Sequence, residues 1–492
     1  MFASVTSSAL VGVEPCPVRV EAHVSGTGKS LFTIVGLPDP AVREARERVR
    51  SAMLASGFPF PGGRVTVNLA PADLPKMGSA YDLPIALGLL AAARTIAPGV
   101  CDVVALGELA LDGSVRGSRG SLAAGIVARQ VGLRCVVATD GAVEAALAGG
   151  DVCGVGSLAE AVVGAVAESV VADSLLRPPS QAIDEATIDL SAVRGQPVAR
   201  RALEIAAAGG HHLLLSGPPG AGKTMLARSL PTILPDLGDE EQLDVARARA
   251  AGGRPPLLST RPPFRTPHHS ATTAAIVGGG SGIPVPGELT LADRGVLFLD
   301  ELAEFPPHLL DSLRQPIEEG VVHVARKGTS VAFPARVQLV AATNPCPCGY
   351  LGDERRPCRC SPGAVERYRR RLSGPLIDRF DLRVPVPRVG AEQMSGPPGE
   401  ESAAVQLRVM GARRAQSGRR LLNCRLDRTA LDAMAWTTTA EAELRRGVDV
   451  LGMTGRGWDR VRRVARTIAD LDGRTPVEVG DVTEALDLRG AM

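Results

Sequence analysis

Residues 213–224 read Leu-Leu-Leu-Ser-Gly-Pro-Pro-Gly-Ala-Gly-Lys-Thr and decide the fold of the chain. The apolar run, the glycine-rich turn and the helix-forming residues 225–230 fit the pattern G-x-x-x-x-G-K-[ST] in strand–turn–helix order. Glycines let consecutive backbone N–H groups curl around a phosphate, and the following helix points the positive end of its dipole at it. The sequence therefore predicts an ATP-binding NTPase, whose phosphate loop is Gly217, Pro218, Pro219, Gly220, Ala221, Gly222, Lys223 and Thr224.

A second apolar run, residues 296–299, ends in Asp300 and Glu301. Asp300 and the Thr224 hydroxyl are predicted to hold Mg²⁺, and Glu301 is predicted to polarise the attacking water. A strand ending in Asp-Glu is common by itself, but its pairing with a phosphate loop upstream is specific. The sequence thus predicts an ATPase with ATP and Mg²⁺ as cofactors.

Asn344 follows the buried run at residues 337–342. A polar residue at the tip of the strand beside the phosphate loop is well placed to sense the γ-phosphate. The alternative is a simple turn residue before Pro345.

Two arginines are further candidates for the catalytic site. Arg379, at the end of an apolar helix, can be supplied to a neighbouring subunit's nucleotide, where it would neutralise transition-state charge. A local salt bridge to Asp378 or Asp381 is the alternative. Arg456, at the start of a later helix, is a candidate second sensor that reaches the nucleotide from a helical lid.

Composition limits the classes of function. The 492 residues carry 55 Lys and Arg against 53 Asp and Glu, so any basic surface must be local. The chain begins without a basic and apolar leader, and its apolar stretches are broken before about 18 residues, so we expect no membrane partner. Nine cysteines, four of them at residues 346–360, fit a reducing cytoplasm with one metal site better than a disulfide framework.

The order of apolar and polar runs predicts an α/β protein of several domains. Residues 1–172 alternate β-type and Ala-rich helical runs, residues 173–189 read as a linker, and residues 190–387 form the ATPase core. A Pro/Gly/Glu-rich linker at residues 388–402 precedes residues 403–492, a predicted lid of Arg- and Leu-rich helices.

Three elements illustrate the expected first domain. Residues 18–24 and 31–35 are predicted strands, and the turn at 26–30 is expected to join them as a hairpin. A charged amphipathic helix is predicted at 41–56, with one apolar side formed by Val42, Ala45, Val49, Ala52 and Met53.

Four cysteines gather in the loop at residues 344–361. Two thiolate pairs, each with one residue between its members, can close a tetrahedral zinc site. This spacing is tighter than usual, and thiols without metal are the alternative. Four unmetallated thiols in so polar a loop would be open to oxidation, which favours metal. The predicted ligands of Zn²⁺ are Cys346, Cys348, Cys358 and Cys360.

Arginines crowd the same region of the chain. A solvated helix face is the ordinary explanation of such a run, but a cationic loop pinned by zinc can meet phosphates with little loss of conformational entropy. We therefore expect contact with DNA. The arginines concerned are Arg355, Arg356, Arg359, Arg367, Arg369, Arg370 and Arg371.

The motifs together resemble the AAA+ superfamily, and specifically the magnesium-chelatase-like ComM/YifB family. Two more stretches carry this resemblance: Pro-Phe-Arg-Thr-Pro-His-His-Ser at residues 263–270 and Asn-Pro-Cys-Pro-Cys-Gly at residues 344–349. The resemblance covers essentially the whole chain. It implies an N-terminal Lon-protease-like domain, an AAA+ P-loop NTPase core and a C-terminal helical lid.

The first domain resembles the Lon-protease-like (ribosomal S5 domain 2-like) fold through residues 75–84 and 107–113. Proteases of this kind use a Ser/Lys dyad. Here Ala80 stands at the expected place of the serine, with Ser79 offset by one, and the helix after Gly120 carries no lysine. The fold is therefore expected without the proteolytic chemistry.

For function, the resemblance implies a homo-hexameric ring with ATP at the subunit interfaces, Arg379 as the finger supplied in trans and Arg456 as the lid sensor. For ComM-like members it implies a helicase that drives branch migration of single-stranded or branched DNA during recombination or natural transformation. Three segments would grip the substrate: the loop with His268 and His269, the glycine-rich stretch 278–282 and the basic hairpin around 326–327. For the two histidines, a metal-binding pair is the weaker alternative.

Two other functions compete with the DNA motor. One is an ATPase subunit that drives Mg²⁺ insertion into a porphyrin, and the other is a regulatory ring that only binds ATP. Intact Glu301, Asn344 and Arg379 argue against the regulatory ring. The cysteine loop with its arginines favours the DNA motor over the chelatase.

Overall fold

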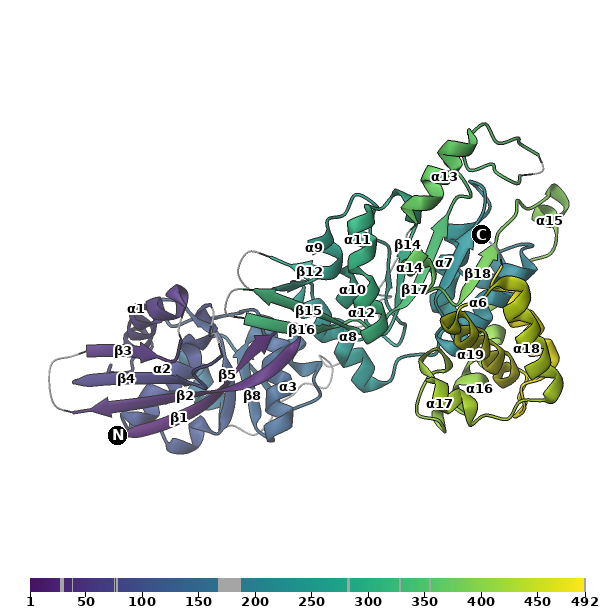
Figure 1. Ribbon diagram of the computed structural model, residues 1–492. Helices are drawn as coiled ribbons and strands as arrows, with labels where there is room; N and C mark the ends of the chain where they lie inside the picture. The colour runs from purple at the N-terminus through teal and green to yellow at the C-terminus, as the bar shows by residue number, and fades with distance from the viewer. Residues whose placement is uncertain are drawn as a thin grey trace. The chain divides into compact units, whose positions relative to one another are not determined.

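The computed structural model describes residues 1–26, 31–37, 39–74, 76, 78–166, 187–280, 284–326, 329–353, 355–372 and 374–490 (Figure 1). The chain forms two compact units, the first of Met1–Gln181 and Gln242–Leu258, the second of Ala182–Glu241 and Ser259–Met492. Most of the predicted linker at 173–189 lies outside the described residues. Residues 242–258, which the sequence assigns to the ATPase core, belong to the first unit.

The first unit is built on a seven-stranded mixed sheet among the described residues, in the order β3-β4-β2-β1-β5-β8-β9. Its strands and helices are β1 (Phe2–Val11), β2 (Glu14–Ser25), β3 (Leu31–Val35), α1 (Pro40–Ala55), β4 (Arg64–Ala70), α2 (Asp82–Ala92), β5 (Val103–Leu106), β6 (Glu108–Leu109), β7 (Val115–Arg116), α3 (Ser121–Val131), β8 (Arg134–Ala138), α4 (Ala142–Ala146), β9 (Val152–Val155) and α5 (Leu158–Gly164). That this unit has the Lon-protease-like fold stays a prediction.

The hairpin predicted across residues 26–30 is wrong. The strands β2 and β3 both form as expected, but β4 lies between them in the sheet. The helix α1 carries the chain from β3 to β4, which pair in parallel, and β4 then pairs antiparallel with β2. A parallel pair needs such a crossover rather than a tight turn.

The helix α1 forms as its sequence dictates. Asp39 caps it by accepting the amide of Val42 at 2.8 Å, and Pro40 occupies the first turn, where a missing N–H costs nothing. The five apolar side chains predicted to share one side of the helix are all fully buried. They pack in the main core of the unit, so the predicted amphipathic helix is confirmed.

The helix α8 (Asp239–Ala251) completes a second, smaller core of the first unit. Its Leu243 and Ala246 are buried against Leu122 and Ile126 of α3. Partly buried neighbours on the same patch include Leu258. The first unit is therefore assembled from two separate parts of the sequence.

The second unit is built on a five-stranded sheet among its described residues, in the order β11-β14-β17-β10-β18, with all neighbours parallel. Its elements up to the last strand are α6 (Pro197–Gly209), β10 (Leu213–Ser216), α7 (Lys223–Ser229), β11 (Phe264–Arg265), α9 (Thr273–Val277), β12 (Gly278–Gly279), β13 (Val285–Pro286), α10 (Glu288–Leu291), β14 (Val296–Leu299), α11 (Pro307–Ser312), α12 (Arg314–Glu319), β15 (Val321–Arg326), β16 (Thr329–Pro334), β17 (Gln338–Thr343), α13 (Pro362–Arg371), α14 (Gly374–Ile377) and β18 (Leu382–Pro385).

The chain ends in a group of helices, where the sequence predicts a lid (green to yellow in Figure 1). They are α15 (Ala391–Ser395), α16 (Ser402–Ser417), α17 (Arg428–Asp432), α18 (Thr438–Leu451), α19 (Gly455–Leu471) and α20 (Val479–Asp487). That these helices form an AAA+ lid stays a prediction. The apolar stripe of α19, with Val461, Val464 and Ile468, is buried in one continuous core with β10 and β18. None of the helices among the described residues combines the length and hydropathy that a membrane span requires.

Candidate nucleotide site and metal centre

The phosphate loop joins β10, which lies between β17 and β18 in the sheet, to α7. Gly220 and Gly222 have φ values of +76° and +91°, which residues with side chains rarely adopt, and a left-handed backbone of this kind allows successive amides to face one anion. Gly217 is required for a different reason, because a Cβ there would lie 2.1 Å from the carbonyl oxygen of Val386. The loop thus has the backbone geometry of a phosphate cradle.

Lys223 lies at the start of α7 with its ammonium group turned into the loop. Its Nζ donates to the carbonyl oxygens of Gly217 at 2.6 Å and Pro218 at 3.0 Å, and to Oδ1 of Asn344 at 3.1 Å. Burial lowers the pKa of Lys223, an effect that the charges of Asp300 and Glu301 oppose. The predicted sensor Asn344 and the predicted phosphate-binding lysine therefore meet in the structure.

Thr224 and Asp300 also meet, since the Thr224 hydroxyl donates to Oδ2 of Asp300 at 2.8 Å. The strand β17 separates β10 from β14, yet the ends of all three strands point to the same edge of the sheet. A hydroxyl and a carboxylate at this edge are the hard oxygen ligands that Mg²⁺ prefers. The pair would hold a magnesium ion, which would neutralise charge on the phosphates of ATP.

Glu301 follows Asp300 in the left-handed region, with φ +52°. This conformation is uncommon for a residue with a side chain and turns the carboxylate out of the strand direction. Its Oε2 lies 3.4 Å from Nδ1 of His269, a contact that is an ion pair when the imidazole is protonated. No sequence pattern indicates this contact, because His269 belongs to the segment after the neighbouring strand β11.

Gln196 is a second residue of the site that sequence reasoning missed. Its side-chain amide donates to the carbonyl oxygen of Ala221 at 3.2 Å and also contacts that of Pro387. It therefore joins the phosphate loop to the segment that leaves β18. Its position before α6, with φ +55°, offered no pattern that predicts such a bridge.

Arg379 lies at the opposite edge of the sheet from the phosphate loop. The residues just before β18, Asp381 and Leu382, donate their amides to the carbonyl oxygen of His212, just before β10. The four residues of β10 span about 13 Å between that edge and the loop. The Arg379 side chain is 8% exposed and pairs with Glu318 at 2.7 Å.

Arg456 lies with Arg379 and not with the phosphate loop. Both line a cavity of about 930 Å³, to which the described phosphate-loop residues do not contribute. Burial lowers the pKa of Arg379, and the charge of Arg456 adds to that effect. The structure therefore separates the predicted site residues of one chain into two groups, at the two edges of one sheet.

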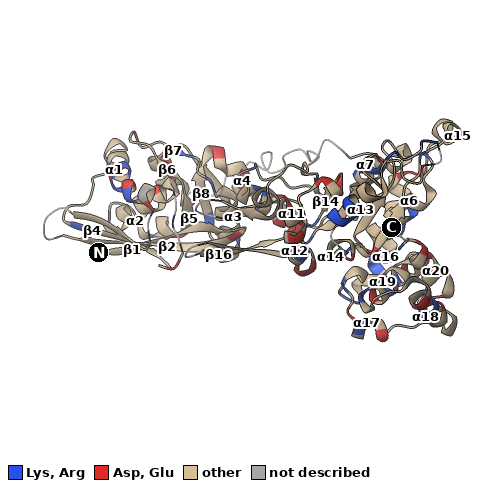
Figure 2. Cartoon of the chain, turned by 45° about the horizontal axis from the view of Figure 1, so that its top comes forward, with Lys and Arg blue, Asp and Glu red and all other residues tan. Residues whose placement is uncertain are grey.

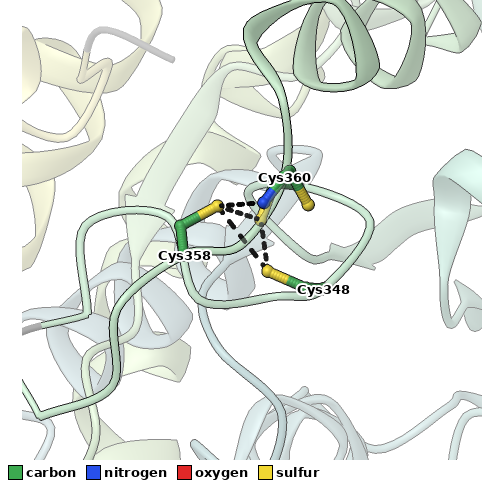
Figure 3. Close-up of side chains that lie close together, drawn as sticks. Cys348, Cys358 and Cys360 are labelled. Atoms are coloured by element: carbon green, nitrogen blue, oxygen red, sulfur yellow. Dashed lines mark hydrogen bonds between the residues drawn. The ribbon is translucent and has the colours of Figure 1, made fainter.

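The four cysteines of residues 346–360 form one cluster. Figure 3 shows three of them, Cys348, Cys358 and Cys360. The Sγ atom of Cys346 lies 3.5 Å from that of Cys348 and 3.7 Å from that of Cys358, and the last two are 3.6 Å apart. All four sulfur atoms lie within 4.8 Å of one another. Tetrahedral zinc with Zn–S bonds of about 2.3 Å sets sulfur atoms about 3.8 Å apart, so the cluster has the dimensions of a metal site.

Backbone amides prepare one of these thiols for metal. Hydrogen bonds from the amides of Arg359 and Tyr350 lower the pKa of Cys348 to about 6. A thiolate is the form that binds metal. The chemistry and spacing of the donors therefore fit a soft or borderline cation such as Zn²⁺.

Models of one protein family match most of the chain. Family models described as "Magnesium chelatase, subunit ChlI", "Subunit ChlI of Mg-chelatase" and "Magnesium chelatase, subunit ChlI C-terminal" match residues 189–394, 20–141 and 399–489. The chain is 44% identical to YifB of Escherichia coli, over 99% of this chain and 96% of that protein. It is 41% identical to the competence protein ComM of Haemophilus influenzae, over 100% and 98% of the two. The chain belongs to the magnesium-chelatase-like ComM/YifB family.

This membership makes the chain an AAA+ ATPase of the ComM family and implies ATP and Mg²⁺ as its cofactors. The likeness to magnesium chelatase subunits themselves is narrower. The ChlI subunit of Chlamydomonas reinhardtii is 29% identical over only 27% of this chain.

The ComM/YifB chain presents a cluster of basic residues next to its cysteine cluster. The seven arginines predicted to contact DNA, in the cysteine loop and on α13, are all exposed. Figure 2 shows the positive charge on α13. Salt bridges engage Arg370 with Glu366 and Arg371 with Glu304.

The loops predicted to grip substrate are described only in part. The glycine-rich stretch forms a small hairpin, β12–β13, and residues 281–283 at its tip lie outside the described residues. The basic hairpin also forms, as β15–β16. Lys327 and Gly328 at its tip, and the side chain of Arg326, are likewise not described.

Proposed function

We propose that this ComM/YifB chain is an ATP-hydrolysing homo-hexameric motor that drives branch migration of DNA. The observation that supports this best is the cluster of seven exposed arginines, in the cysteine loop and on α13, beside the nucleotide site. Cys346, where the basic loop begins, is two residues beyond Asn344, which contacts Lys223. Changes at the γ-phosphate can therefore move a surface suited to phosphate contacts.

The ring is proposed because the chain holds two halves of an active site that cannot meet within it. Lys223, Thr224, Asp300, Glu301 and Asn344 lie at the carboxyl edge of the sheet. Arg379 and Arg456 lie at the other edge, where they can approach the nucleotide of a neighbouring copy. A head-to-tail ring brings the two edges together at every interface. We infer that both arginines act in trans and stabilise charge at the γ-phosphate.

Zinc is proposed as the resident metal of the cysteine cluster. It would bind through the sulfur atoms of Cys346, Cys348, Cys358 and Cys360 and hold the basic loop in one conformation. Elemental analysis of protein purified without chelator should give about one zinc per chain. A metal-free protein with an intact ATPase would refute this assignment.

DNA is proposed as the substrate, recognised through its phosphates. The name of the relative ComM, a competence protein, is consistent with this. Arginines on a loop and on one helix face suit the backbone of a single strand or a junction, and such contacts carry little base specificity. The chelatase function is the alternative, and its support is the partial match to ChlI subunits.

The deciding experiment offers the protein a four-way DNA junction with ATP and Mg²⁺. We expect the junction to stimulate ATP hydrolysis, and ATP to drive strand exchange. Replacing Arg367 and Arg369 on α13 by alanine should weaken binding and reduce the salt slope by about one to two, since each neutralised phosphate contributes about 0.9 to that slope. A matched control is Arg445→Ala, an exposed arginine on α18. An ATPase rate that ignores DNA, with salt-insensitive binding, would favour the chelatase.

The ring is tested by mixing inactive proteins. Arg379→Ala and Lys223→Ala should each lose ATPase activity, since one removes the finger and the other the phosphate-binding lysine. Mixed together, they form some interfaces that carry both intact residues. Recovery of part of the activity supports a shared site, and a monomeric enzyme that is active on its own would refute it.

A further inference from the structure

A glycine of the cysteine loop packs against the phosphate loop. Gly349 is buried, with φ +83°, and its amide donates to the Cys346 carbonyl oxygen at 2.9 Å. A Cβ at this position would lie 2.5 Å from Cδ and 2.8 Å from Cγ of Pro219, and 3.8 Å from Cγ of Asn344. The loop backbone therefore touches both the phosphate loop and the sensor side chain.

The same loop is tied to the segment on the other side of the phosphate loop. Arg388 pairs with Asp353 at 3.0 Å, and its guanidinium lies 5.3 Å from the ring centroid of Tyr350. Two residues before Arg388, the amide of Val386 donates to the carbonyl oxygen of Ser216 at 2.7 Å. The loop and the end of β18 thus enclose residues 217–219 from two sides.

We propose that the cysteine loop is a wall of the nucleotide site, and that the metal held by its four cysteines keeps this wall against Pro219. Metal occupancy then sets the affinity for ATP. This rests on the zinc site and the ATPase activity proposed above. The physical reason is that the sulfur cluster joins Cys346 and Cys348 to Cys358 and Cys360 across the loop, with Gly349 directly after the first pair. Loss of the ion removes the restraint that holds Gly349 and Asn344 in place.

A matched pair of glycines tests the contact. Gly349 and Gly352 lie in the same loop with nearly equal φ values, +83° and +80°, so alanine costs a similar backbone strain at each. At Gly352, no atom of the described residues other than its chain neighbours lies within 4 Å of an added Cβ. Gly349→Ala should weaken binding of a fluorescent ATP analogue by about tenfold or more, by forced overlap with Pro219, and keep its zinc. Gly352→Ala should bind within about twofold of the wild type.

A second variant guards against a general loss of structure in Gly349→Ala. Pro219→Ala removes the Cγ and Cδ atoms that the new methyl group would meet. Measured against Pro219→Ala alone, the double variant should show a much smaller loss of affinity than Gly349→Ala shows against the wild type, so most of that loss is recovered. An overlap elsewhere or a misfolded loop would show no such recovery, and that result would overturn the assigned contact.

Removal of zinc tests the role of the metal. Wild-type protein is stripped with a zinc chelator, returned to excess Mg²⁺, and titrated with the fluorescent ATP analogue. We expect affinity to fall about tenfold and to return when zinc is added back. Equal affinity with and without zinc, or equal behaviour of the two glycine variants, would overturn the proposal.

The outcomes separate this proposal from those it rests on. Protein that contains no zinc as purified would refute the zinc site and the metal dependence together, while the glycine pair would still decide the wall contact. Protein that binds the ATP analogue but never hydrolyses ATP would refute only the proposed ATPase activity. The wall contact and the metal dependence would still be tested, because the experiments above measure the affinity for the analogue.

Discussion

Asp381 joins the start of β18 to the lid helix α19, and its removal should loosen the lid. Its carboxylate is 3% exposed and accepts from Nη1 of Arg460 at 2.6 Å. Its other oxygen lies 3.2 Å from Nδ1 of the buried His211, whose Nε2 lies 2.7 Å from the Thr467 hydroxyl. Burial alone would raise the pKa of Asp381, but the hydrogen bond with His211 and the charge of Arg460 hold it well below its usual range.

Asp381→Ala would leave Arg460, itself 13% exposed, without its carboxylate. Breaking a buried pair in this way costs about 3–5 kcal/mol of stability. The control is Glu441→Ala. Glu441 also pairs with an arginine of the C-terminal helices, Arg445, at 3.1 Å, but both side chains of this pair are exposed, so its loss should cost about 1 kcal/mol or less.

Tryptophan fluorescence during a urea titration measures the difference. Both tryptophans of the chain, Trp436 and Trp458, belong to the lid and pack against its core. The midpoint of the unfolding transition that these tryptophans report should fall by about 1 M urea or more in Asp381→Ala and far less in the control. The difference in urea midpoint between the two variants should become smaller below about pH 4. A carboxylate with a depressed pKa in the folded state contributes its full stabilisation only above its pKa in the unfolded state. Equal shifts in both variants would refute the reasoning.

Other predictions concern the nucleotide site, the pH dependence of stability and the first unit. In nucleotide titrations, Lys223→Ala should lose tight ATP binding, whereas Glu301→Gln should still bind ATP. In phosphate-release assays, Glu301→Gln should show no turnover, and a wild-type rate would mean that another group is the general base. Burial lowers the pKa of His212, whose Nδ1 accepts the Leu339 amide, to about 4. The second unit should therefore lose stability as pH falls from about 6.5 to 4, and His212→Gln should remove this loss in urea titrations. The first unit should cleave no fluorogenic peptide, and cleavage that disappeared in Ser79→Ala would contradict the absence of a dyad.

The sequence predicts best where chemistry and local structure share one stretch of chain. The phosphate loop, the Asp300–Glu301 pair and Asn344 each end an apolar run, and parallel strands bring such ends to one edge of a sheet. The contacts within this group follow from that rule. The clustering of the four cysteines was also predictable, because a loop this short keeps its four thiols close together.

Contacts between distant segments could not be predicted from the sequence. The contact of His269 with Glu301 and that of Gly349 with Pro219 depend on which strands become neighbours, and no local pattern encodes this. Arg456 was predicted to reach the nucleotide from the lid, and no local pattern indicated that it would line the same cavity as Arg379. The hairpin at residues 26–30 failed for the same reason, because a strand from later in the chain enters between its two arms.

The discontinuity of the first unit has a consequence for how the protein is made. Leu122 and Ile126 are covered by Leu243 and Ala246 of α8, which the ribosome adds only after the phosphate loop. At about 5–20 residues per second, the first unit waits several seconds beyond residue 181 for the helix that completes its smaller core. During that interval an apolar patch stays open to water and to chaperones. A fragment that ends at residue 181 would keep that patch permanently, so we expect it to aggregate unless residues 242–258 are supplied.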